Sequence, residues 1–188
     1  MISKVKTFNK VVFLTFDDGP EPYITEFVLD ELKKYSFKAT FFCRGDNAVK
    51  YPDLLQRIKN EGHTIANHTY SHLHAFDVSA KEYAADVDKA NNILHTNIFR
   101  PPHGSLSFGA WLRIHKGNHI YFWSLNSGDS DMERYNYKHS LETLKTKTTA
   151  GDIVLFHFCH KHERETIELL PEYLQWLNDN LYKSKALV

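Results

Sequence analysis

The chain lacks any long apolar segment. None of its 188 residues belongs to a run of about 18 apolar side chains, which excludes a membrane-spanning helix. An excess of one charge is also missing, because 23 Lys and Arg balance 23 Asp and Glu. No long-range field therefore favours nucleic acid or an anionic membrane. Residues 1–6 contain no apolar stretch of the kind a signal peptide needs. We expect a cytoplasmic protein, although a secreted protein without its leader would look the same.

Cysteine is scarce. Cys43 and Cys159 could form only one bridge, and each lies in or beside a segment typical of a buried strand. We expect two reduced thiols. Repeats, low-complexity tracts and linkers are missing as well, and 42% apolar with 24% charged residues is ordinary for a globular protein. We predict one domain, residues 1–188.

The hydrophobic pattern alternates between two periods along the chain. Residues 11–16 form a continuous apolar run typical of a strand buried on both faces, and Ile24 to Tyr35 then repeat at helical spacing. Ser79 and Glu82 form a capping box that begins another helix. Further strands are predicted at 37–43, 63–67, 98–99, 119–124, 152–158 and 185–187, and further helices at 52–60, 106–116, 138–147 and 166–182, the last bent or restarted at Pro171. This alternation predicts a parallel sheet wrapped by helices.

Polar residues follow the predicted strands. They are Asp17, Asp18, His68, Arg100, residues 126–129 and His157. In a parallel barrel all these strand ends lie on one face, which is where such enzymes hold their chemistry. We therefore expect these side chains to meet at one rim.

Two of these groups have the composition of an open metal site. In a tight turn His68 and His72, four residues apart, can bind one ion together. A carboxylate from Asp17 or Asp18 completes three protein ligands and leaves a position for water, as in catalytic rather than structural zinc sites. Alone, each motif is more typical of a surface pair or of a turn. Together at neighbouring strand ends they indicate a metal centre.

Four motifs carry a family resemblance. Residues 15–19 read Thr-Phe-Asp-Asp-Gly, residues 68–72 fit His-Ser/Thr-x-x-His, residues 100–104 fit Arg-x-Pro-aromatic-Gly except at the aromatic position, and residues 155–157 fit Leu-x-His. In this order and spacing the chain resembles the polysaccharide deacetylase family, the NodB-homology domain of carbohydrate esterase family 4. The resemblance extends from about Val11 to the C-terminus. It implies an α/β fold of NodB-homology type, a distorted (β/α)7 barrel, and metal-dependent removal of N-acetyl groups from a sugar.

The resemblance also implies roles for individual residues. Asp18, His68 and His72 would hold the metal ion, which polarises the amide carbonyl and activates water. Asp17 would take the proton of that water as general base. Arg100 would orient Asp17 and keep it ionised, because a nearby cation favours a carboxylate.

Further residues would bind the substrate and release the product. The backbone N–H of His103 would hold the oxyanion, a contribution of about 3–4 kcal/mol, and its neighbours Pro102 and Gly104 would shape that loop. Leu155 would line the pocket for the acetyl methyl group. His157 would protonate the departing amine, because an unprotonated nitrogen leaves poorly.

The chain departs from the family pattern at two motifs. His103 stands where Tyr or Phe is usual, which makes the substrate-facing surface more polar. The motif Asp-x-x-Asp-Trp is replaced by residues 126–130, Asn-Ser-Gly-Asp-Ser. We expect Asn126 to orient His157 without supplying a charge, which would lower the pKa of that histidine. Asp129 matches the second Asp of the motif, and we count it with the catalytic residues. It either reaches His157 and supplies the missing charge, or it points to the rim. Ser130 stands where many members of the family have a Trp that lines the acetyl pocket. We expect Trp123 to lie in the core.

The remaining histidines are expected to be incidental. The segment 157–162 contains three histidines and Cys159 and has the composition of a second metal cluster. We nevertheless expect His160 and His162 in a rim loop, solvated or in contact with substrate. His74 is expected outside the metal site, and His63 at the start of a strand is expected to be a surface or capping group.

The sequence thus predicts a metal-dependent hydrolase acting on an N-acetylated saccharide, with Zn2+ or else Co2+, Ni2+ or Mn2+. A deformylase or another small-molecule C–N hydrolase would use the same ligands. A carbohydrate- or metal-binding pseudoenzyme is the alternative from another class, and a non-haem iron oxygenase fits the ligand set less well. The sequence does not determine which sugar is bound, how long the glycan is, whether an amide or an ester is cleaved, or the oligomeric state.

Overall fold

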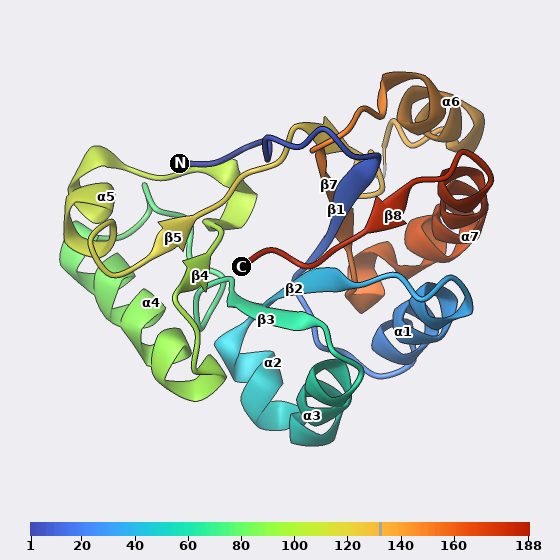
Figure 1. Cartoon of the computed structure of the whole chain (residues 1–188). Helices are drawn as coiled ribbons and strands as arrows, with labels where there is room; N and C mark the ends of the chain where they lie inside the picture. The colour runs from blue at the N-terminus through green and yellow to red at the C-terminus, as the bar shows by residue number, and fades with distance from the viewer. Residues whose placement is uncertain (132) are drawn as a thin grey trace.

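The computed structural model describes residues 1–131 and 133–188, and its centre is a curled parallel sheet (Figure 1). Strand β1 (Val11–Asp17) lies in the middle, parallel to β2 (Ala39–Cys43) on one side and to β7 (Ile153–His157) on the other. The order is β5-β4-β3-β2-β1-β7-β6, with β8 paired to the start of β1. The path of seven strands is the distorted α/β barrel that the sequence predicted.

The remaining elements alternate along the chain. The other strands are β3 (Thr64–Asn67), β4 (Ile98–Phe99), β5 (His119–Ile120), β6 (Leu125–Asn126) and β8 (Lys183–Ser184). The helices are α1 (Ile24–Lys34), α2 (Gly45–Lys50), α3 (Pro52–Asn60), α4 (Ala80–Leu94), α5 (Phe108–Ile114), α6 (Tyr137–Lys147) and α7 (Glu163–Asp179), with short 3-10 turns η1 (Pro102–Gly104) and η2 (His160–His162). No helix of the described residues is long and apolar enough to cross a bilayer.

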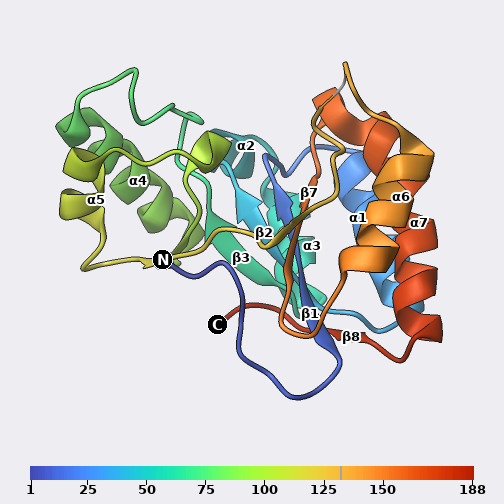
Figure 2. The ribbon, with the colours of Figure 1, turned by 90° about the horizontal axis from the view of Figure 1, so that it is seen from above.

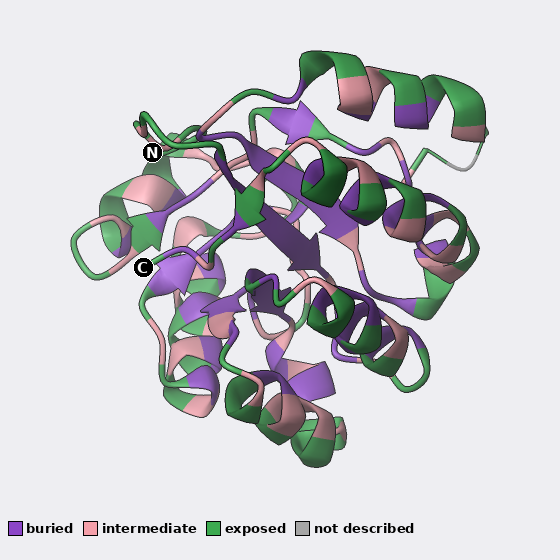
Figure 3. Ribbon diagram, turned by 45° about the vertical axis from the view of Figure 1, so that its right-hand side comes forward, coloured by how far each residue is buried: buried purple, intermediate pink, exposed green. Residues whose placement is uncertain are grey.

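The sheet is buried by helices that surround it (Figures 2 and 3). Strand β1 is buried along its whole length, as its continuous apolar sequence requires. Phe16 stacks on Phe41 of β2 and Phe156 of β7, with ring centroids 5.2 and 5.7 Å apart. These neighbouring strands are thereby held in register around β1.

Two predicted strands differ in the structure, and one helix was not predicted. The strand predicted at 119–124 is shortened to β5, and β6 begins only at Leu125, because Tyr121 and Phe122 pair with Ile2 near the N-terminus. The last strand lies at 183–184 rather than 185–187, since Lys183 bonds to the carbonyl of Lys10 at the start of β1. Helix α2 was not predicted.

All the strands run parallel, so their carboxyl ends lie at one end of the barrel. Asp17 ends β1, Asn67 ends β3 and His157 ends β7. The loops that follow these strands carry the polar side chains that the sequence placed at one rim.

Candidate active site

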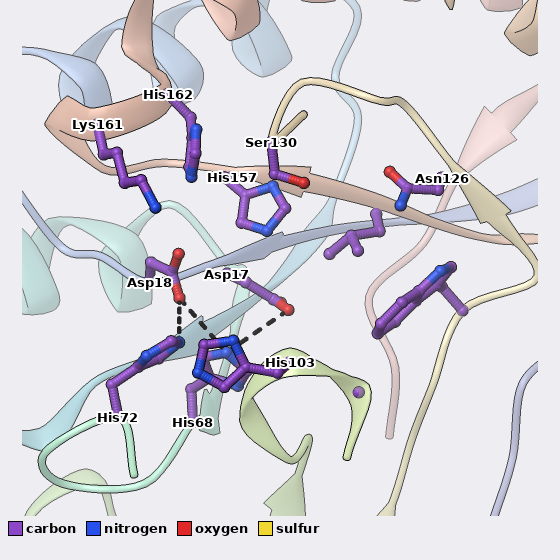
Figure 4. Close-up of a pocket in the computed structure, with 13 residues that line it drawn as sticks. Asp17, Asp18, His68, His72, His103, Asn126, Ser130, His157, Lys161 and His162 are labelled. Atoms are coloured by element: carbon purple, nitrogen blue, oxygen red, sulfur yellow. Dashed lines mark ion pairs between the residues drawn. The ribbon is translucent and has the colours of Figure 1, made fainter. Parts of the chain in front are cut away.

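Asp18, His68 and His72 come together directly after β1 and β3. Asp18 Oδ1 lies 2.9 Å from His72 Nε2 and 3.4 Å from His68 Nε2 (Figure 4). Nδ1 of His68 lies 2.8 Å from the carbonyl oxygen of Arg100, which can only accept, so Nδ1 carries the proton and Nε2 presents a lone pair. Each of the three residues offers a ligand atom within 4.8 Å of the others.

This donor set fits a divalent transition metal. Asp18 Oδ1 is buried and has no hydrogen-bond partner among the residues that the structure describes. Burial opposes ionisation of Asp18, but His68 and His72 outweigh it and hold the pKa of the carboxyl well below its usual range. A carboxylate and two imidazole nitrogens turned toward one point are the ligands of an open zinc site.

The loop that carries both histidines is not helical, and its shape is set from outside. Thr69 and His72 have positive φ angles of 64° and 59°. Asn67 accepts the N–H of Thr69, and Asp86 of α4 accepts the N–H groups of Tyr70 and Ser71 at 2.8 and 3.0 Å. These bonds replace those that a helix would supply, and they fix the turn that brings His72 to Asp18.

Asp17 is held by a buried cation. Nη1 of Arg100 donates to Asp17 Oδ1 at 2.7 Å and to Thr15 Oγ1 at 2.9 Å. Arg100 is completely buried, with its guanidinium 4.0 Å from the centroid of the Phe42 ring. Asp17 Oδ2 remains 3.8 Å from His68 Nε2. Arg100 thus orients Asp17 from behind, and the carboxylate faces the metal group.

His157 is paired with Asp129, not with Asn126. Asp129 Oδ1 lies 2.8 Å from His157 Nδ1, and Asp129 Oδ2 accepts the backbone N–H of the same residue at 2.7 Å. Asn126 instead accepts the N–H of Gly128. Burial opposes a charge on His157, yet Asp129 raises its pKa to about 9. The expected lowering of this pKa is wrong, because a fully buried carboxylate supplies the missing charge.

These groups surround a cavity of about 310 Å³. Its lining consists of Asp17, Asp18, His68, His72, His103, Gly104, Trp123, Asn126, Ser130, Leu155, His157, Lys161 and His162. Arg100, Asp129 and Pro102, which the sequence counted with the site, are buried and lie outside this lining. The first two act through Asp17 and His157, and Pro102 begins the turn η1 that carries His103.

His103 lies in the loop opposite His157. Its φ of 58° is left-handed, and its N–H takes part in none of the hydrogen bonds shown for the described chain. Its ring packs against His72 and His74, with centroids 4.7 and 5.3 Å apart. His74 itself stays outside the metal group, as expected, and faces Asp77. His103 thereby adds imidazole surface beside the metal ligands.

Sequence reasoning missed three features of this cavity. Trp123 lines it rather than lying wholly in the core, and it supplies an aromatic wall despite the loss at Ser130. His162 is only 4% exposed and lines the cavity, so it is not solvated, and of the two expected roles only contact with substrate remains. Lys161 lines the same side. The composition of the segment 157–162, which suggested a metal cluster, pointed toward His162 and Lys161, whereas nothing in the sequence pointed toward Trp123.

Known proteins share this architecture. A family model described as polysaccharide deacetylase matches residues 4–117. A peptidoglycan-N-acetylglucosamine deacetylase of Bacillus cereus is 45% identical over 106 residues, 53% of this chain and 38% of that protein. The peptidoglycan-N-acetylmuramic acid deacetylase PdaC of Bacillus subtilis is 30% identical over 181 residues, 93% of this chain and 37% of that protein. The chain thus spans a little over a third of the length of these two relatives.

The solved structures agree with the sequence comparison. The crystal structure of a peptidoglycan N-acetylglucosamine deacetylase superposes with a TM-score of 0.90 at 29% identity, over 99% of this chain and 90% of the other. The match of the family model covers β1 to β4 and includes Asp17, Asp18, His68, His72 and Arg100. This chain belongs to the polysaccharide deacetylase family.

Proposed function

We propose that the chain is a metal-dependent hydrolase that removes the N-acetyl group from an amino sugar of a peptidoglycan-type glycan. One observation carries this proposal. Asp18, His68 and His72 converge on one point, while Asp17 and His157 line the same cavity (Figure 4). Metal-dependent amide hydrolysis uses a metal site together with a general base and a general acid, and this cavity offers a carboxylate for the first role and a histidine for the second.

Zinc is the ion we propose for Asp18, His68 and His72, with cobalt, nickel and manganese as alternatives. One carboxylate and two imidazoles suit these borderline ions better than Mg²⁺ or Ca²⁺, which prefer oxygen ligands. When bound, the ion would polarise the acetyl carbonyl and lower the pKa of a water molecule in the cavity.

The chain's own residues move the protons. Asp17, with Oδ1 held by Arg100, takes the proton of the attacking water. The N–H of His103 donates to the oxyanion that forms on the acetyl oxygen. His157 donates a proton from Nε2 to the departing amine, since Asp129 occupies Nδ1. A pKa of about 9 keeps that proton in place at neutral pH.

The cavity walls suit a small acyl group on a sugar. Leu155 is 3% exposed and offers an apolar contact for the acetyl methyl group. Trp123 presents an aromatic surface beside it, of the kind on which a sugar ring packs. The Bacillus cereus relative is named for N-acetylglucosamine and the Bacillus subtilis relative for N-acetylmuramic acid. We propose N-acetylglucosamine, because it lacks the lactyl group that muramic acid adds beside the acetamide.

Acetate release tests the proposal. The zinc-loaded chain should release acetate from chitin oligomers and from peptidoglycan fragments, and chelation should abolish the activity. Asp17→Asn should lower the rate at least about a hundredfold while metal content stays constant. A fully metallated chain that releases no acetate from any of these glycans would support the pseudoenzyme instead. Formate release from N-formyl compounds would support the deformylase.

Two departures from the family pattern suggest the pseudoenzyme, namely Asn126 and the Trp that is missing at Ser130. The pairing of His157 with Asp129 removes the first reason. The cytoplasmic location expected from the sequence remains a prediction, which fractionation of the producing cells would test.

A further inference from the structure

Two titratable side chains of the cavity have no part in this mechanism. Cys159 lies two residues after the end of β7, and His162 ends the turn η2 that follows. Both are buried, and His162 lines the cavity. Cys159 Sγ lies 3.8 Å from Asp18 Oδ2. One ligand atom from each of Asp18, Cys159 and His162 lies within 4.8 Å of the others.

His162 carries a polar atom that the protein itself does not satisfy. The residue is 4% exposed, and its Nδ1 has no hydrogen-bond partner among the described residues. A buried nitrogen without a partner is unfavourable in a folded protein. His160, in the same turn, is exposed, and its Nδ1 lies 2.9 Å from Glu163. Of the two histidines, only His162 is therefore both buried and without a partner at Nδ1 among the described residues. Nδ1 of His162 is therefore not used by the described residues and is available to bind a ligand.

The two oxygens of Asp18 face different groups. Oδ1 lies between His68 and His72, whereas Oδ2 lies toward Cys159. Figure 4 shows this arrangement: one oxygen is joined to the two histidines, and the other points away from them on the side of Lys161 and His162. A carboxylate in this position can bridge two ions, one on each oxygen.

We propose that Asp18, Cys159 and His162 form a second site, for a thiophilic divalent ion such as zinc or cobalt, which shares the carboxylate of Asp18 with the first site. One sulfur, one imidazole nitrogen and one carboxylate oxygen are ligands that these ions accept and that Mg²⁺ and Ca²⁺ avoid. The proposal goes beyond the deacetylase function and does not depend on it, since ion binding needs no acetylated substrate.

Occupation of the second site inhibits the proposed reaction. The rings of His162 and His157 have centroids only 5.1 Å apart. An ion bound to His162 would therefore lie beside His157, in the part of the cavity that the leaving amine must reach. The second ion also binds the carboxylate of Asp18, and the shared carboxylate is then a weaker ligand for the first ion. Excess zinc is thus expected to inhibit, while one equivalent activates.

Cobalt titration tests the second site directly. The metal-free chain is titrated with Co²⁺ and followed by absorption, because a cobalt–thiolate bond gives a charge-transfer band in the near ultraviolet. The first equivalent should produce only the weak visible bands of a nitrogen and oxygen site, and the second should produce the thiolate band. Equilibrium dialysis with elemental analysis should show two ions bound to the wild type and one to Cys159→Ser.

Matched variants give the controls. Cys159→Ser should remove the thiolate band, retain the first equivalent and abolish inhibition by excess zinc. His162→Gln should weaken the second equivalent at least about tenfold. Cys43→Ala, which removes the other thiol from the interior of β2, should leave the band unchanged. Circular dichroism verifies that each variant is folded.

Three outcomes would overturn the assignment. The wild type could bind a single equivalent with no thiolate band at any ratio. The band could appear with the first equivalent, which would make the two ligand sets alternatives for one ion. The band could persist in Cys159→Ser. A chain that binds two ions but releases no acetate would contradict the proposed function and leave this inference standing.

Discussion

His157 Nδ1 and Asp129 Oδ1 lie 2.8 Å apart, and this contact orients His157 to donate a proton to the departing amine. Asp129 is fully buried and also accepts from the backbone N–H of His157 and from Thr166 Oγ1. These bonds fix the carboxylate and direct the opposite ring nitrogen of His157 into the cavity. The ring is thereby held in the protonation state that an acid needs.

Asp129→Asn should move the basic limb of the pH–activity profile to lower pH. Burial lowers the pKa of His157, but Asp129, with smaller effects of Asp18 and Asp17, raises it to about 9, so removing the charge of Asp129 lowers that pKa toward its ordinary value. The proton is present below the pKa, so the loss grows as pH rises. At pH 8 we expect a decrease in kcat of about thirtyfold or more, with a smaller loss at pH 6.

The pH dependence of kcat from pH 5 to 10 measures this change. Asp131→Asn, in the same loop but exposed, should leave the profile unchanged. An NMR titration of the His157 imidazole separates the change in pKa from a loss of folding. An unchanged basic limb in folded Asp129→Asn would show that His157 is not the acid.

Gly104→Ala should damage both stability and substrate binding. Gly104 has a φ of 61°, and a methyl group added there would lie 2.6 Å from Cη2 of Trp123. The left-handed backbone costs an L-residue about 1–2 kcal/mol, and Trp123 must move out of the cavity wall. We expect KM to rise along with the loss in the free energy of unfolding.

Gly117→Ala provides the comparison, because a methyl group there meets no atom within 4 Å. Its free energy of unfolding should stay within about 0.5 kcal/mol of the wild type. Denaturant melts measure the free energy of unfolding of both variants, and steady-state kinetics measure their KM. If Gly104→Ala matched Gly117→Ala in KM, Trp123 would not be a wall of the substrate pocket.

The fold and most of the metal group could be predicted from the sequence because their signals are local. Continuous apolar runs indicated the buried strands, and residues at strand ends had to meet at one edge of a parallel sheet. The partner of His157 could not be predicted, because Asn126, at the end of β6, and Asp129, in the loop that follows, are only three residues apart. Which of them turns inward depends on Gly128, whose φ is 82°, and on Thr166 in α7.

The backbone conformations of His72 and His103 were beyond local prediction. Both have a positive φ, which a non-glycine residue adopts only when surrounding contacts impose it. For His72 these contacts come from Asp86, fourteen residues later in the chain. The burial of His162 likewise depends on how η2 packs over the cavity.

Asp86→Ala should weaken metal binding without touching a ligand. Asp86 accepts the N–H groups of Tyr70 and Ser71 and the hydroxyl of Ser71 at 2.7 Å, and it thereby holds the turn before His72. Without these bonds the turn must be ordered when the ion binds. We expect zinc affinity to fall by about ten- to a hundredfold, and kcat at saturating zinc to change little.

Competition with a chromogenic chelator measures the zinc affinity. Asp88→Ala, two residues later on the exposed face of α4, should bind zinc as the wild type does. Equal affinities of the Asp86 and Asp88 variants would mean that the turn before His72 holds its shape without this carboxylate.

His63→Gln should make the protein less sensitive to acid. His63 is buried, and Nδ1 accepts the N–H of Ala39 at 3.1 Å, which requires the neutral ring. It was expected at the surface, but it packs edge-on against Phe41. Burial, with a smaller effect of Lys38, lowers its pKa to about 4. The unfolded chain therefore binds this proton more readily than the folded one.

The sign of the pH effect follows from that difference. The contribution of neutral His63 is complete above the unfolded pKa of about 6.5 and is lost as pH falls through about 4. The loss amounts to about 3 kcal/mol over this window. Urea melts between pH 4 and 7 should show a shallower decline in the free energy of unfolding for His63→Gln. His119→Gln, at an exposed position, should follow the wild type. Parallel curves for the wild type and His63→Gln would mean that His63 accepts its proton within the folded state.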